Sequence, residues 1–152
     1  KIELIVRGIC VLIPGIPGVS DNITVRSIVG RFLEHSRIFW FRNGGREELY
    51  ISSADWMPRN LNDRVELMVP IEDPEIKRRL KQMVDIELSD NQKAHIMQAD
   101  GTWLKTISAE NQLCAQEYFQ KIAEKRDAED EMTLAQKLEP YTPVLGHGDG
   151  SD

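Results

Sequence analysis

The stretch that decides the fold reads RIFWFRNGGREELYISS, residues 37–53. Residues 37–41 are rich in β-branched and aromatic side chains, and residues 49–53 open a second such run with Leu-Tyr-Ile. Between them stands Asn43-Gly44-Gly45, and these residue types tolerate the positive φ angles of tight turns. The pattern predicts a β-hairpin.

Further strands and helices are predicted on both sides of the hairpin. Residues 2–6 form a short apolar strand, and the proline- and glycine-rich residues 12–22 form a loop. Residues 65–69 read as another strand, and Asp73 then caps a helix with Pro74 at its first position. The apolar stripe of that helix consists of Ile76, Leu80, Met83, Val84 and Leu88.

Residues 23–34 have an ambiguous period. Val25, Ile28 and Phe32 fit one face of a helix, whereas Ile23-Thr24-Val25 could equally open a strand. We expect a short strand or turn that runs into a helix and stops before Ser36.

The last third of the chain continues the alternation. Residues 93–107 predict two strands around the turn at Asp100-Gly101, and a final helix is expected from Ser108. Alternating strands and helices indicate an α/β layered domain over residues 1–126. Residues 127–152 are acidic and then glycine-rich, and we expect a flexible tail there.

Charge is segregated along the chain although the net charge is −6. Residues 1–64 carry nine basic and seven acidic side chains, whereas residues 65–152 carry ten basic and eighteen acidic ones. Eight of the nine cations in the first part are arginines, whose planar fork matches phosphate oxygens two at a time. This pattern favours a local anion site over a general nucleic-acid surface.

Composition bounds the cellular setting. No apolar run approaches the roughly 18 residues that a membrane span needs, and the first residues resemble a strand more than a signal peptide. We expect the chain to have been cut from something longer. Cys10 and Cys114 stand far apart, which suits small buried side chains in a reducing cytoplasm. We expect a cytoplasmic protein, with peripheral membrane association open.

His35 is the histidine with a functional setting. It precedes Arg37 at the mouth of the hairpin, whose second strand delivers Ser53 and Asp55. His147 lies in the glycine-rich tail and His95 has no companion at ligand spacing. The sequence contains neither a zinc-ligand cluster nor a phosphate-binding glycine loop with a following Gly-Lys-Ser/Thr, so we expect no metal ligands here.

The pattern His35-x-Arg37, a turn, then Ser53-x-Asp55 resembles a degenerate half-motif of the phospholipase D superfamily. Arginine replaces the lysine of that motif, Arg42 stands where it has an aspartate, and Asp55 replaces its asparagine. The missing aspartate would orient the histidine. Its absence counts against a plain phosphodiesterase.

A wider set of segments resembles the C-terminal domain of bacterial polyphosphate kinases. The resemblance runs from about residue 2 to residue 90 and more loosely to residue 126. The segments that carry it are VRGIC (6–10), SDNI (20–23), SIV (27–29), RFLEH (31–35), NGG (43–45), YISSADWM (50–57), RN (59–60) and DRVE (63–66).

The resemblance implies a phospholipase-D-like α/β fold with a mixed sheet flanked by helices. It implies reversible transfer of the terminal phosphoryl group of ATP to polyphosphate, with Mg²⁺ held by residues outside this chain. The phosphorylated histidine would lie in another domain of the same kinase. Expected partners are ATP or ADP, polyphosphate and the remaining domains, in a homo-oligomer when full-length, without nucleic acid.

The resemblance also assigns site residues. Arg7 and His35 match the ATP-contacting arginine and histidine, with His35 as the catalytic group, and Arg64 matches a further phosphate-site arginine. Arg37, Ser53 and Asp55 are expected to support the hairpin and hold His35. Two other functions stay open: a module that binds nucleotide or polyphosphate without catalysis, and a phosphodiesterase whose homodimer combines one histidine from each chain.

Overall fold

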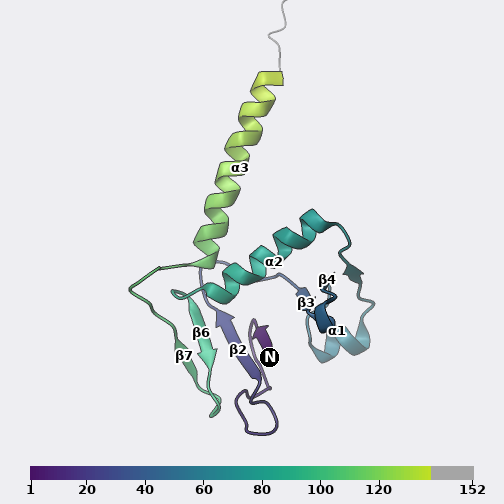
Figure 1. Cartoon of the computed structure of the whole chain (residues 1–152), viewed down its shortest axis with the longest axis vertical. Helices are drawn as coiled ribbons and strands as arrows, with labels where there is room; N and C mark the ends of the chain where they lie inside the picture. The colour runs from purple at the N-terminus through teal and green to yellow at the C-terminus, as the bar shows by residue number, and fades with distance from the viewer. Residues whose placement is uncertain (138–152) are drawn as a thin grey trace, which may run out of the picture. The chain divides into compact units, whose positions relative to one another are not determined.

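The computed structural model describes residues 1–137, and Figure 1 shows their elements. One sheet has the strand order β1-β2-β6-β7, where β1 is Ile2–Ile5, β2 is Ile23–Ile28, β6 is Ala94–Met97 and β7 is Trp103–Lys105. β1 pairs with β2 in parallel, and the other neighbours are antiparallel. The expected mixed sheet is confirmed.

The core of this sheet lies on β2 and β6. Val25 and Ala94 are fully buried, and Ile28 and Met97 are 8% exposed. Hydrophobic side chains at positions 25 and 28 therefore belong to a strand between two partners. Removing such chains from water is the main source of stability for a sheet face.

The predicted hairpin is confirmed and gains a third strand. β3 (Ile38–Phe41) pairs antiparallel with β4 (Glu48–Ser52), and β4 pairs with β5 (Met68–Pro70). The 3₁₀ turn η1 (Asn43–Gly45) joins β3 to β4, and all three of its residues have positive φ angles. Asparagine and glycine accept that conformation at the least steric cost.

Two of the predicted helices are present, and α2 starts at its predicted cap. α2 (Pro74–Ser89) begins after Asp73, whose Oδ1 accepts hydrogen bonds from the Glu75 and Ile76 N–H groups at 2.9 Å each. α3 (Ala115–Lys137) is the last helix. No helix in residues 1–137 is long and apolar enough to cross a membrane.

The prediction of a helix before Ser36 is wrong. β2 takes residues 23–28, and residues 29–37 form an irregular segment without helix or strand. Pairing with β1 on one side and β6 on the other satisfies the backbone of residues 23–28, which local periodicity could not reveal.

Other boundaries also differ from prediction. α1 (Pro58–Asp63) was not expected, and the strand expected at residues 65–69 begins only at Met68. The last helix starts at Ala115 rather than Ser108, because Ser108 makes a local turn to Glu110 and Asn111 has a φ of 50°. Cys10 and Cys114 are free and half-buried, not buried.

The chain divides into two compact units, residues 1–118 and 119–152. In the second unit α3 continues through residues assigned to the tail, so residues 127–137 are helical. The glycine-rich stretch with His147 lies outside the described residues, and the flexible tail stays a prediction there.

Candidate active site

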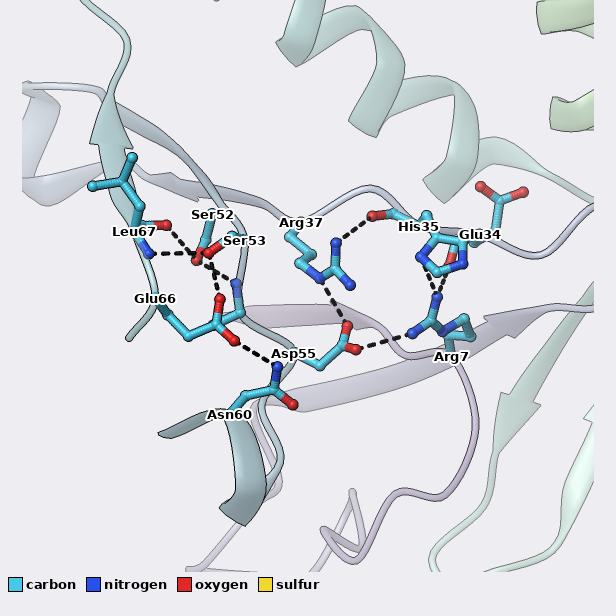
Figure 2. A network of polar contacts seen from close by, with 11 residues as sticks. Arg7, Glu34, His35, Arg37, Ser52, Ser53, Asp55, Asn60, Glu66 and Leu67 are labelled. Carbon is cyan, nitrogen blue, oxygen red and sulfur yellow. Dashed lines mark hydrogen bonds and ion pairs between the residues drawn. The ribbon is translucent and has the colours of Figure 1, made fainter. Parts of the chain in front are cut away.

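Asp55 joins two arginines from distant parts of the first unit. Its Oδ2 accepts a hydrogen bond from Arg7 Nη2 at 3.1 Å, and its Oδ1 accepts one from Arg37 Nε at 2.9 Å. Figure 2 shows the carboxylate between the two guanidinium groups. The three side chains are 25–28% exposed, so solvent can reach them. We call Arg7, His35, Arg37 and Asp55 the Arg7–His35 cluster.

Backbone pairing brings these residues together. Val6 N–H donates to Arg26 O at 2.8 Å, which extends the β1–β2 pairing to the residue before Arg7. Gly8 follows with a φ of 86°, a conformation that turns the chain away at once. Arg37 precedes β3 and Asp55 follows β4, so the hairpin holds both at its open end.

The arginines keep Asp55 ionised. The hydrogen bond from Arg37 is the largest cause and lowers the pKa of the carboxyl; burial opposes it, and the charges of Arg37 and Arg7 lower the pKa further. The same hydrogen bond raises the pKa of Arg37. The cluster therefore keeps both guanidinium charges and one carboxylate at neutral pH, which leaves a net positive site.

His35 is exposed and is held from one side. Arg7 Nη1 lies 2.8 Å from His35 Nδ1 and 2.9 Å from the backbone oxygen of Glu34. Arg37 Nη1 donates to the His35 backbone oxygen at 3.4 Å. A guanidinium only donates hydrogen bonds, so Nδ1 accepts here and the ring proton lies on Nε2. Nε2 is then the donor of this imidazole.

The arginines retain donors for a ligand. Arg7 has five N–H groups, and its contacts with Glu34, His35 and Asp55 account for three of them among the described residues. Two N–H groups of Arg7 and the Nε2–H of His35 thus have no hydrogen-bond partner among the described residues. Several N–H groups around a net positive charge can bind phosphate oxygens.

Ser53 lies in a separate brace next to Asp55. Its Oγ donates to Glu66 Oε2 and accepts from the Leu67 N–H at 3.0 Å, while Asn60 Nδ2 donates to Glu66 Oε1 at 2.8 Å (Figure 2). These hydrogen bonds lower the pKa of Glu66, with Ser53 the larger cause. Ser53 therefore contacts the chain around β5, and the brace fixes the end of β4 that carries Asp55.

Arg64 stands apart from the cluster. It is exposed just after α1, and its charge contributes to the lowered pKa of Glu66. Within residues 1–137, no hydrogen bond or ion pair joins it to Arg7 or His35. The structure thus brings together four of the six predicted site residues and leaves Ser53 and Arg64 outside that contact set.

Three contributors were not found from the sequence. Glu66 and Asn60 form the brace; Asn60 lies within α1 and Glu66 follows that helix, and neither position carried a local signal of this contact. Gln116 contacts the segment before His35 from 84 positions away, a pairing for which sequence spacing gives no signal.

Comparison with known proteins decides the family. The model of the family described as "Polyphosphate kinase C-terminal domain 2" matches residues 1–116, which include every residue of the cluster and of the brace. The chain belongs to the polyphosphate kinase C-terminal domain family. The predicted resemblance is therefore confirmed.

Curated polyphosphate kinases resemble this domain closely over part of their length. That of Pseudomonas aeruginosa is 55% identical over 112 residues, which are 74% of this chain and 16% of that protein. That of Synechocystis is 53% identical over 128 residues, which are 82% of this chain and 18% of that protein. The polyphosphate kinase domain described here thus spans less than a fifth of these relatives.

A solved structure confirms the fold. The crystal structure of polyphosphate kinase from Porphyromonas gingivalis superposes with a TM-score of 0.77 at 41% identity, covering 85% of this chain and 20% of that one. The mixed α/β fold is therefore that of a polyphosphate kinase, a phospholipase-D-like fold family.

Proposed function

We propose that this domain supplies the phosphate-binding half of a polyphosphate kinase active site. The complete enzyme would reversibly transfer the terminal phosphoryl group of ATP to polyphosphate. The observation that carries the proposal is the pair of arginines on one carboxylate, with the Nε2–H of His35 beside them. The family membership supports it, because all four residues lie in the matched span.

The chemistry follows from charge. A transferring phosphoryl group carries negative charge on its equatorial oxygens, and catalysis consists mainly of neutralising that charge and aligning the groups. Arg7 and Arg37 would supply fixed positive charge. Asp55 would prevent the two guanidiniums from repelling one another out of position. Arg64 would contact a more distant phosphate, since no contact ties it to the cluster.

His35 would act as a hydrogen-bond donor to phosphate oxygen rather than as a nucleophile. A histidine that attacks phosphorus through Nε2 needs a free lone pair on that atom, with the proton on Nδ1. Here Arg7 donates to Nδ1, which places the proton on Nε2. The nucleophilic histidine is therefore proposed to lie in another domain. The same geometry disfavours a phosphodiesterase that would use His35 as its nucleophile.

Magnesium is proposed to be held elsewhere in the enzyme. The described residues contain no group of three or more potential metal-ligating side chains. Both oxygens of Asp55 accept from arginines, and both oxygens of Glu66 accept from Ser53 and Asn60. These carboxylates do not fit a metal site, so no step is assigned to the ion here. The homo-oligomer and the cytoplasmic or membrane-peripheral location remain proposals.

The proposal is tested by separating the chain from the complete enzyme. A polyphosphate kinase that carries this chain as its C-terminal segment should convert radiolabelled ATP into polyphosphate, whereas the 152-residue chain alone should make none. Robust synthesis by the chain alone would show that it holds its own nucleophile. If the complete protein binds ATP without turnover, the domain is a binding module and the proposal fails.

A further inference from the structure

The segment that carries His35 needs support from outside. Residues 29–37 form neither helix nor strand, and between the end residues Val29 and Arg37, which still bond to the neighbouring strands, the backbone has no regular ladder to pair with. The side-chain amide of Gln116 supplies hydrogen bonds that a neighbouring strand would otherwise make. Its Oε1 accepts from the Phe32 N–H at 3.1 Å, and its Nε2 donates to the Phe32 backbone oxygen at 2.7 Å. One side chain thus bonds both backbone groups of one residue.

The same amide also holds Glu34. Gln116 Nε2 donates to Glu34 Oε1 at 2.6 Å, so the amide makes three hydrogen bonds while Gln116 is only 7% exposed. A buried amide with unmade bonds would be costly, and this one uses its acceptor and both donors. No other side chain of similar length offers one acceptor and two donors at one end.

Gln116 is itself fixed by the surrounding elements. Asp90, 2% exposed, accepts from the Ala115 N–H through Oδ2 at 2.8 Å and from the Lys93 N–H through Oδ1 at 2.7 Å. The carboxylate therefore ties the first turn of α3 to the start of β6. Gly30 leaves room for the amide, because a Cβ at that position would lie within contact distance of Gln116 Oε1 and 2.8 Å from its Cδ.

From this geometry we infer that Gln116 is a positioning residue for His35, which acts through residues 32–34. The link is direct: Gln116 holds Phe32 and Glu34, and the Glu34 backbone oxygen and His35 Nδ1 share Arg7 Nη1 as donor. If the segment shifts, Arg7 cannot serve both acceptors, and the proton of the imidazole is no longer fixed on Nε2. The catalytic part of this inference rests on the proposed function.

The test uses two readouts that fail separately. The first is the pair of ¹⁵N chemical shifts of the His35 ring in this chain, which report the position of the ring proton whether or not the enzyme turns over. The second is the kcat of the complete kinase. Gln116→Glu keeps the acceptor but loses both donors, and Gln112→Glu makes the same charge change at an exposed position nearby.

Gln116→Glu should convert the single Nε2–H tautomer to a mixture and lower kcat by up to about 100-fold, the scale of a misplaced catalytic group. Glu34→Gln combined with Gln116→Glu restores a donor between positions 34 and 116 and should recover part of both signals. Gln112→Glu should change neither. If Gln116→Glu does not fold, Gln116→Met fills the same volume without the bonds and has the same expected result.

The outcomes are distinct. Unchanged ring shifts in folded Gln116 variants would overturn the inference, whatever the activity. A lowered melting temperature with normal shifts and kcat would reduce Gln116 to a structural role and overturn it too. If the wild-type complete protein makes no polyphosphate, the proposed function fails, while altered ring shifts in this chain would still support the positioning of His35 by Gln116.

Discussion

Arg7 donates to the Nδ1 of His35 at 2.8 Å, so a cation rather than a carboxylate sets the tautomer of this histidine. A carboxylate on Nδ1 would hold a proton there and make Nε2 a base. The arginine does the opposite and makes Nε2 a donor. The direction of this one hydrogen bond is the reason to assign His35 the role of a hydrogen-bond donor to phosphate oxygen.

Arg7→Ala in the complete kinase should reduce kcat/KM for ATP strongly. The substitution removes a phosphate-facing charge and also frees the tautomer of His35, and loss of one such contact costs about 2–4 kcal/mol of transition-state stabilisation. Arg46→Ala, at an exposed position after the hairpin turn, is the matched control and should have little effect. Steady-state kinetics on both variants give the comparison. Equal losses would mean that the arginines act only through diffuse charge.

His35→Gln should separate binding from turnover. A glutamine can accept from Arg7 with its oxygen and donate with its nitrogen, so the fold and part of the ATP affinity should persist. Its flexible amide cannot reproduce the fixed aim of the imidazole Nε2–H at the transferring phosphoryl group, and turnover should fall about 100-fold or more. Thermal unfolding and steady-state rates of the same preparation measure both properties. Near-normal turnover with a lowered melting temperature would end the catalytic assignment.

Asp55→Asn should weaken the chain toward neutral pH but not in strong acid. The pKa of Asp55 is lowered in the folded chain, so its carboxylate stabilises the fold above its ordinary titration range, near pH 4, and that stabilisation is lost as the pH falls further. For a partly exposed ion pair the effect is about 1 kcal/mol or less. Urea unfolding at pH 7 and pH 3 tests this, with exposed Asp63→Asn as control. A loss of the same size at both pH values would contradict an ionic role.

Glu87→Gln should stabilise the chain at alkaline pH and leave it unchanged near pH 4. Burial, together with the charge of Glu34, raises the pKa of Glu87 from 4.5 to about 7, and the residue is 6% exposed. The folded chain holds this proton more tightly than the unfolded chain. Stability is therefore full below pH 4.5 and falls as the pH rises to 7, by about 3 kcal/mol at most.

The measurement for Glu87 is the free energy of unfolding in urea at pH 5 and pH 8. Wild type should lose stability between them, and Glu87→Gln should lose less. Exposed Glu117→Gln provides the control and should follow wild type. If Glu87→Gln destabilises the chain at pH 8, the carboxylate makes favourable contacts there and the expected sign is wrong.

Local sequence signals predicted the elements whose causes are local. The Asn43-Gly44-Gly45 turn and the Asp73-Pro74 helix start are set by residues within a few positions of one another, and both were found. The helix expected at the end of residues 23–34 failed because pairing with β1 and β6 keeps the chain extended through Ile28, and the distant Gln116 then bonds the backbone of Phe32. α1 was missed because six residues offer no apolar repeat.

The residues of the candidate site likewise divide into those that the sequence predicted and those that it did not. His35, Arg37 and Asp55 were chosen from one motif in the hairpin region, and Arg7 from a resemblance, and the structure brings all four together. Their catalytic roles stay predictions. The contacts of Glu66 with Ser53 and of Gln116 with Phe32 were not predicted, because each hydrogen bond forms only when separate elements meet.

The close approach of Gln116 to Gly30 should make the two positions interdependent across homologous sequences. A side chain at position 30 would occupy the space of the amide, so a relative with alanine there should carry a shorter residue at position 116. By itself, Gly30→Ala should therefore lower the stability of the fold. The loss should be smaller when Gly30→Ala is combined with Gln116→Ala. Such paired substitutions would leave a covariation signal between a loop before the hairpin and the first turn of α3. That signal would connect two segments 86 positions apart that share no regular backbone pairing.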